Sequence, residues 1–150
     1  MTSAEPILDV RNLRVAFRSR RSSVTALRDV SFSLPPGRTL ALVGESGSGK
    51  SVSALAVMGL LPSNGEISGG SIAYRNRSGQ VTAIETADQA QMRRLRGAEI
   101  AMIFQEPMSS LNPLFTIGDQ IGEMLLLHSD LDATARRKRV LDMLELVEIP

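Results

Sequence analysis

This sequence has no cysteine, no tryptophan and only one tyrosine among its 150 residues. Without cysteine, the chain cannot contain a disulfide scaffold, a cysteine-ligated zinc site or a thiol nucleophile. Aromatic residues make up 3% of the chain, too few for a platform that stacks several nucleic-acid bases. Lys and Arg number 17 against 16 Asp and Glu. This balanced charge argues against bulk electrostatic binding to nucleic acid or to an anionic membrane.

Long hydrophobic runs are missing as well. No apolar stretch approaches the roughly 20 residues that a membrane-spanning helix needs. The first ten residues, MTSAEPILDV, lack the apolar core of a signal peptide. The remaining composition, with 43% hydrophobic residues, is typical of a globular protein that is long enough to bury a core. We therefore expect one folded domain in the cytosol.

The first half of the chain predicts strands on either side of a glycine-rich loop. Residues 7–17 and 24–34 alternate apolar and polar side chains, which is typical of half-buried strands. The charged stretch 18–23 separates them, so the pair predicts an antiparallel hairpin. Residues 39–43, TLALV, form a continuous apolar run, which predicts a strand buried on both faces. A second apolar strand is predicted over residues 99–104.

The other segments before residue 105 predict shorter elements. A helix is expected after the loop, with Pro62 just past its end. A short strand is predicted over residues 71–74, a polar and variable insertion over 75–87, and a short basic helix over 89–96.

From about Ser109 onward the apolar spacing predicts helices. Asp130 or Asp132 can cap the last of them, and its apolar residues are expected to share one face. These residues are Val140, Leu141, Leu144 and Val147. The chain stops at Pro150 with no closing strand, so we expect a truncated domain.

The loop GESGSGKS, residues 44–51, matches the phosphate-binding pattern G-x4-G-K-[S/T] between a predicted strand and a predicted helix. We expect its three glycines to turn the backbone with positive φ and to bring N–H groups around an anion. The helix N-terminus adds a partial positive charge. Lys50 would reach the β- and γ-phosphates, and the Ser51 hydroxyl would bind Mg²⁺. The candidate nucleotide-binding residues are Gly44, Glu45, Ser46, Gly47, Ser48, Gly49, Lys50 and Ser51.

The loop alone does not separate kinases, GTPases, helicases and transporter ATPases. However, VGESGSGKS, the predicted antiparallel strands before it and IFQEPMSSLNP after it together resemble the nucleotide-binding subunit of ABC transporters. Within that family, QMRRLRGAEIAMIFQEPMSSLNPLFTIGDQI is similar to the oligopeptide and dipeptide importer ATPases, and most similar to the glutathione-importer branch. The resemblance runs from about residue 7 to 150 and is weakest over 75–87.

The resemblance implies a fold and a division of the chain. The fold class is α/β, a P-loop NTPase of ABC type. It has a parallel core sheet, an antiparallel β subdomain and the start of a helical subdomain, all truncated. The nucleotide-binding core and β subdomain would occupy about residues 1–108, and the incomplete helical subdomain about 109–150.

The resemblance also assigns roles to single residues. The loop matches the Walker A motif, so Lys50 is a catalytic candidate. Gln105 matches the Q-loop glutamine, which in the family touches Mg²⁺ and the attacking water and signals to the membrane subunit. An amide group can do both, because its oxygen can bind a metal and its NH₂ can hold a water. Phe17 matches the aromatic residue that stacks on adenine. Its pattern alone favours a core residue, and its place just before the polar turn balances the two roles. The implied metal ligands are Ser51 and Gln105.

The function implied by the resemblance is that of an ATP-binding subunit that powers import of peptides, whether oligopeptides, dipeptides or glutathione-like, across the bacterial inner membrane. Its cofactors would be ATP and Mg²⁺. Its partners would be membrane permease subunits, a second ATPase domain and, indirectly, a solute-binding protein, with no nucleic acid. It would lie peripherally on the cytoplasmic face of that membrane. The family's Walker B aspartate, catalytic glutamate, LSGGQ signature and late histidine do not occur before Pro150. We therefore expect the 150 residues alone not to hydrolyse ATP.

Two alternatives stay open. The first is a non-catalytic module that binds a nucleotide. The second is a soluble P-loop enzyme such as a kinase, which would need an acceptor pocket and lid arginines. The predicted hairpin before the loop and the segment FQEPMSSLNP argue against the kinase.

Overall fold

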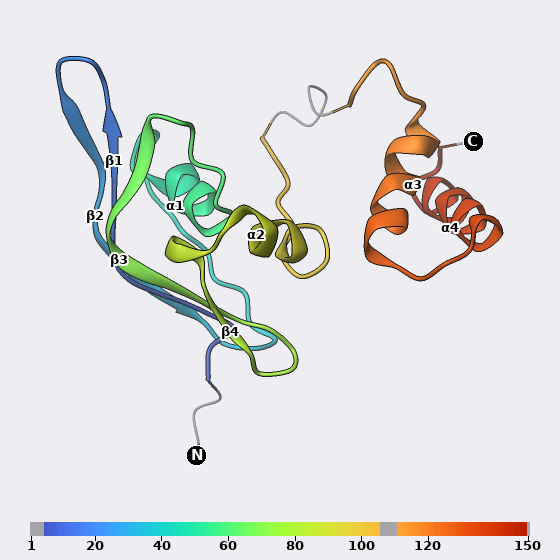
Figure 1. The fold of residues 1–150 in the computed structure, drawn as a ribbon, viewed down its shortest axis with the longest axis horizontal. Helices are drawn as coiled ribbons and strands as arrows, with labels where there is room; N and C mark the ends of the chain where they lie inside the picture. The colour runs from blue at the N-terminus through green and yellow to red at the C-terminus, as the bar shows by residue number, and fades with distance from the viewer. Residues whose placement is uncertain (1–4, 106–110, 150) are drawn as a thin grey trace. The chain divides into compact units, whose positions relative to one another are not determined.

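A computed structural model describes residues 5–105 and 111–149 of the chain (Figure 1). It divides into two compact units, Met1–Glu99 and Ile100–Pro150, and each is described here by itself. Residues 106–110, which belong to the segment FQEPMSSLNP and include the expected start of the helical region near Ser109, lie outside the described residues.

The first unit is built on a four-stranded sheet with the strand order β2-β1-β3-β4. Every neighbouring pair is antiparallel. The strands are β1 (Leu8–Arg18), β2 (Ser23–Leu34), β3 (Gly65–Arg75) and β4 (Val81–Ala83). The predicted hairpin is confirmed, because β1 pairs with β2 from Leu8 opposite Leu34 to Arg18 opposite Ser23.

The central sheet extends further than the sequence pattern indicated. Strand β3 begins at Gly65, not at residue 71 as predicted. The reason is that β1 pairs with β3 from Tyr74 back to Gly65 and supplies its hydrogen-bonding partners. A weak local preference of glycine and serine for strands is thus overridden by pairing. The segment predicted as a polar and variable insertion, residues 75–87, contains β4 and the short 3₁₀ helix η1 (Ile84–Thr86).

Two helices cover one face of this sheet. They are α1 (Lys50–Val57) and α2 (Gln89–Leu95), and Figure 1 shows them on the same side of the strands. Their apolar residues join those of the strands in one buried cluster. It contains Val10, Leu13, Val15, Leu27, Ala56, Val57, Ile72, Ile84, Met92 and Leu95. The predicted basic helix over 89–96 is confirmed, and Asp88 caps it with a complete capping box.

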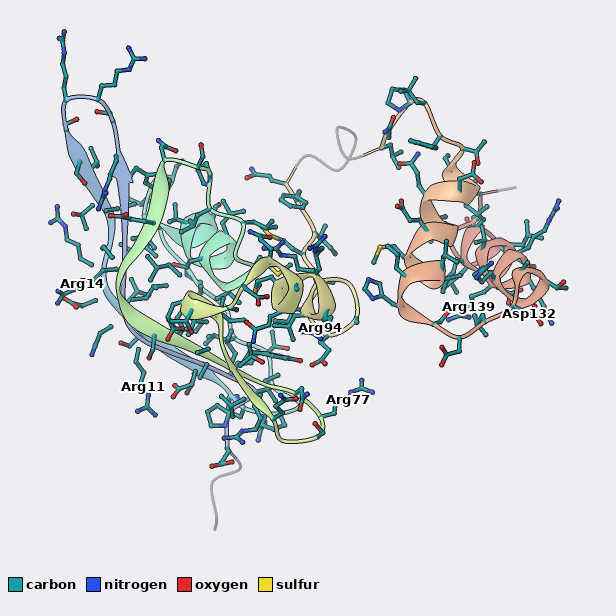
Figure 2. The ribbon with its side chains drawn as sticks, viewed as in Figure 1. Arg11, Arg14, Arg77, Arg94, Asp132 and Arg139 are labelled. Atoms are coloured by element: carbon teal, nitrogen blue, oxygen red, sulfur yellow. The ribbon has the colours of Figure 1, made fainter. Side chains whose placement is uncertain are left out.

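The opposite face of the sheet carries charged side chains. Arg11 and Arg14 point away from the two helices (Figure 2). Arg11 pairs with Asp9, and Arg14 pairs with Asp29, each at 2.7 Å. Exposed pairs of this kind contribute little stability, but they mark this face as the one that meets solvent. The core and the glycine-rich loop therefore belong to the helix-covered side.

Two predictions about buried strands are wrong for the described residues. Neither residues 39–43 nor residues 99–104 form a strand. Most of their apolar side chains are exposed, with exposed fractions of 94% at Val43 and 92% at Ile103. An apolar run becomes a strand only when neighbouring strands take up its N–H and C=O groups. No strand of the described residues pairs with either run, so the parallel part of the expected sheet is not assembled there.

The second unit contains the helices α3 (Ile117–His128) and α4 (Ala133–Leu146). They confirm the prediction of helices in this region, except that residues 111–116 are not helical and α3 begins only at Ile117. Asp132 caps α4 through its side chain (Figure 2). The predicted common face is only partly correct. Val140 is buried against α3, whereas Leu141 is 57% exposed and Val147 lies past the helix end and is 60% exposed. None of the described helices combines the length and the apolar character needed to cross a bilayer.

Candidate functional site: the phosphate-binding loop

The glycine-rich loop leads directly into α1, which begins at Lys50 as predicted. Gly47 and Gly49 have positive φ values of 81° and 97°, a conformation that costs other residues strain. Gly44 does not, so the prediction of positive φ is wrong at this position. Gly44 is needed for space instead, because a Cβ there would lie 2.7 Å from the Ser48 Oγ.

The N-terminus of α1 has no side-chain cap. Its N-cap is Gly49, and its first turn carries no acidic residue. The other α-helices of the described residues differ, because Asp88, Thr116 and Asp132 each accept a hydrogen bond from a backbone N–H of the helix that they cap. The first N–H groups of α1 are therefore left for an external acceptor. Together with the helix dipole, they favour an anion at this end.

The Lys50 side chain folds back across the loop. Its Nζ donates hydrogen bonds to the backbone oxygens of Gly44 and Glu45, at 2.6 and 2.7 Å, and to the Ser48 Oγ at 3.3 Å. Three contacts hold the ammonium group over the turn, which is closed by a hydrogen bond from the Ser48 N–H to the Glu45 oxygen. A positive charge and the uncapped helix end thus meet in one loop. This combination suits an anion with several oxygens.

The end of the loop is anchored to the sheet and to the helix. A Cβ at Gly49 would overlap the Leu27 Cδ2 of β2, so only a glycine allows the backbone to lie this close. Leu27 is 2% exposed. The Gly49 oxygen accepts hydrogen bonds from the backbone N–H of Ser53 at 2.9 Å and from its hydroxyl at 3.1 Å. Sequence reasoning missed both supporting residues, since a strand leucine and a helix serine carry no signal of their own.

Phe17 lies near the end of β1, opposite Val24 of β2 and Gly65 of β3. It is half-buried and packs against the buried cluster that includes Leu27. Val15, two residues earlier, is fully buried, and residues two apart in a strand point to the same face. The aromatic ring therefore lies on the same sheet face as Leu27, the residue that contacts Gly49 at the end of the loop.

The other predicted site residues are exposed. Glu45, Ser46 and Ser51 are accessible in the loop and in the first turn of α1. Gln105 is exposed and belongs to the second unit, so its meeting with the loop stays a prediction. Among the described residues, no three His, Cys, Asp or Glu side chains are grouped as a metal site. Within the first unit the exposed Ser51 hydroxyl is an oxygen donor of the kind that suits Mg²⁺, whose remaining ligands can be water and phosphate.

Comparisons with known proteins agree with this geometry. The sequence profile of the family described as "ABC transporter" matches residues 27–150. A Brucella ovis protein named as a peptide import ATP-binding protein is 49% identical over 149 residues, which cover 99% of this chain and 44% of that protein. The glutathione import ATP-binding protein GsiA of Pectobacterium atrosepticum is also 49% identical, covering 100% of this chain and 24% of that protein. The chain thus spans less than half the length of these curated relatives.

A solved structure shows the same fold. It is a dimeric ATP-binding cassette in a post-hydrolysis state, bound to ADP and Pi. It superimposes with a TM-score of 0.76 at 22% sequence identity, and the match covers 94% of this chain and 57% of that one. The expected ABC-type fold class is confirmed.

Proposed function

This chain belongs to the ABC transporter family, and from that premise we propose that it is the front part of an ATP-binding subunit that powers the import of peptides or glutathione-like molecules across the bacterial inner membrane. The observation that carries the proposal is the phosphate-binding loop. Its helix end is uncapped, and Lys50 is held across it by the Gly44 and Glu45 oxygens.

The loop residues fit the triphosphate of ATP. The backbone N–H groups of residues 47–51 would cradle the phosphate oxygens, and Lys50 would exchange its contacts with loop oxygens for contacts with the β- and γ-phosphates. Because little covalent chemistry is required of the protein in phosphoryl transfer, this neutralisation and positioning are its main contribution. Mg²⁺, when bound through Ser51 and Gln105, supplies further neutralisation of the phosphates.

Phe17 would provide the surface for the adenine base. Its half-buried ring lies on the same sheet face as Leu27, which supports the loop at Gly49. Stacking of a base on an aromatic ring contributes roughly 1–3 kcal/mol. Its loss should therefore weaken ATP binding without abolishing it.

The transported molecule and the partners rest on the names of the relatives, which refer to peptide and glutathione import. The partners would be permease subunits of the membrane, a second ATPase domain and, indirectly, a solute-binding protein. The subunit would lie peripherally on the cytoplasmic face of the membrane. The catalytic glutamate and the signature motif would come from sequence outside these 150 residues.

The test is Lys50→Ala in the natural polypeptide that carries this sequence. We expect loss of ATP hydrolysis and of peptide uptake, with an unchanged circular dichroism spectrum, because the Lys50 side chain contacts the loop and is not part of the buried cluster. Lys138→Ala is the matched control, since Lys138 is an exposed residue of α4 and its loss should change neither activity. Uptake by a well-folded Lys50→Ala protein would refute the assignment. ATP binding without hydrolysis in the natural polypeptide would favour a non-catalytic nucleotide module instead.

A further inference from the structure

We propose that Gly65 is a positioning residue for the nucleotide base, because its missing side chain leaves the space in which the Phe17 ring lies. The inference rests on the proposed function, in which Phe17 stacks on adenine. It assigns a purpose to a glycine that lies outside the phosphate-binding loop and contacts no phosphate.

The space at Gly65 is filled by the Phe17 ring. A Cβ built on Gly65 would lie 2.7 Å from the Phe17 Cε1, 3.1 Å from its Cδ1 and 3.3 Å from the Pro62 oxygen. The contact with the oxygen is relieved by a shift of a few tenths of an ångström, whereas the contact with the ring is not. Carbon atoms in contact are normally about 3.5–4.0 Å apart, so the ring and a methyl group cannot occupy these positions together. The backbone of Gly65 does not have positive φ. Its conformation is therefore open to alanine, and the glycine is required by space alone.

Backbone hydrogen bonds on both sides of Gly65 oppose a shift of β3. The Gly65 N–H donates to the Pro62 oxygen at 2.7 Å, and the Arg18 N–H donates to the Asn64 oxygen at 2.8 Å. The Arg18 side chain also pairs with Glu66 across the two strands, at 2.6 Å. A methyl group at position 65 would therefore be accommodated by rotation of the Phe17 side chain rather than by a shift of β3.

The direction of this rotation follows from the packing. On its inner side the ring lies against the buried cluster, which is close-packed and offers no room for it. The ring would have to turn outward, into the space where a base would stack. A side chain at position 65 would thus remove the flat surface without changing the loop that binds the phosphates.

The experiment compares two ligands on the natural polypeptide, ATP and inorganic tripolyphosphate, which lacks the base. For Gly65→Ala we expect ATP affinity to fall roughly 5- to 150-fold, the range that corresponds to loss of one base stack, with tripolyphosphate affinity unchanged. Gly69→Ala is the matched control. It lies in the same strand without positive φ, and its Cβ would come no closer than 3.4 Å to the Arg14 side chain. Both affinities should remain those of the wild type.

A double variant tests whether Gly65 acts through the ring. Phe17→Ala alone should lower ATP affinity, and adding Gly65→Ala to it should lower the affinity no further, because the atoms that clash are gone. The same double variant also serves if Gly65→Ala lowers the free energy of unfolding. In urea titrations, Gly65→Ala should then cause no further loss of stability when it is added to Phe17→Ala.

Three outcomes would overturn the inference. ATP affinity of Gly65→Ala could equal that of the wild type, tripolyphosphate could be weakened as strongly as ATP, or the two substitutions could act additively. Failure of the proposed function looks different. In that case Lys50→Ala would keep its affinity for both ligands, or Phe17→Ala would bind ATP normally.

Discussion

Replacing Leu27 by alanine should destabilise the first unit and weaken phosphate binding at the same time. Leu27 is 2% exposed, belongs to the buried cluster and is the side chain on which Gly49 rests. Truncation of a buried leucine to alanine costs about 2–5 kcal/mol. A urea slope of about 2 kcal/mol per molar converts this cost into a midpoint shift of about 1–2.5 M. With its support gone, the loop should hold ATP and tripolyphosphate less tightly by similar factors.

Urea unfolding and ligand titration on the natural polypeptide measure the two effects. Val24→Ala is the matched control, because Val24 lies in the same strand and is 63% exposed. Its replacement should change the free energy of unfolding by no more than about 0.5 kcal/mol. Leu27→Met, which conserves volume, should cost less than about 1.5 kcal/mol and retain most of the affinity. A loss at Leu27→Ala no larger than at Val24→Ala would refute the reasoning, and so would a large loss of stability with unchanged phosphate affinity.

Three further predictions concern other parts of the chain. Arg96→Ala should lower the free energy of unfolding by about 1.5–3 kcal/mol in urea titrations. The Arg96 guanidinium donates hydrogen bonds to the Met58 and Gly59 oxygens at 2.8 and 2.6 Å, which link the end of α1 to the end of α2. An unchanged unfolding midpoint would contradict this prediction. Burial, together with a hydrogen bond to a neighbouring carboxylate, raises the pKa of Tyr74 in the folded state. The stability that Tyr74 contributes should therefore be complete below pH 10 and be lost as pH rises through the folded pKa. In unfolding measurements between pH 8 and 11, Tyr74→Phe should lose less stability than the wild type. An identical decline in both proteins would refute this prediction. Gln105→Ala should bind ATP almost normally but hydrolyse it slowly, and a loss of ATP binding in a folded protein would instead make Gln105 a primary ligand.

Features that depend on neighbours along the chain could be predicted from the sequence. The hairpin of β1 and β2 follows from alternation over residues 7–17 and 24–34, with a charged turn between them. The helix starting at Lys50 follows from the glycines before it and the apolar spacing after it. The phosphate-binding character of the loop is similarly local, because its N–H groups, glycines and lysine are contiguous in the chain.

Features that depend on distant partners could not be predicted in this way. Residues 39–43 have the apolar pattern of a buried strand, yet no strand of the described residues pairs with them. Residues 65–70 have a poor strand composition and nevertheless form half of β3, because β1 lies beside them. The hydrophobic pattern of a segment indicates which side chains it can bury. Strand pairing also requires a second segment, and the pattern of the first does not predict where that segment lies.

In this protein, the phosphate-binding loop, the helix that follows it and the antiparallel hairpin could be predicted from the sequence, because each is encoded within one continuous segment of the chain. Which residues support that loop depends instead on how the strands pack against it. Leu27 of β2 lies under Gly49, and Gly65 of β3 makes room for Phe17 of β1, so each contact joins segments that are far apart in the chain. The register of the strands includes irregular pairing between β1 and β2. A shift of one residue would turn every side chain of a strand to the opposite face.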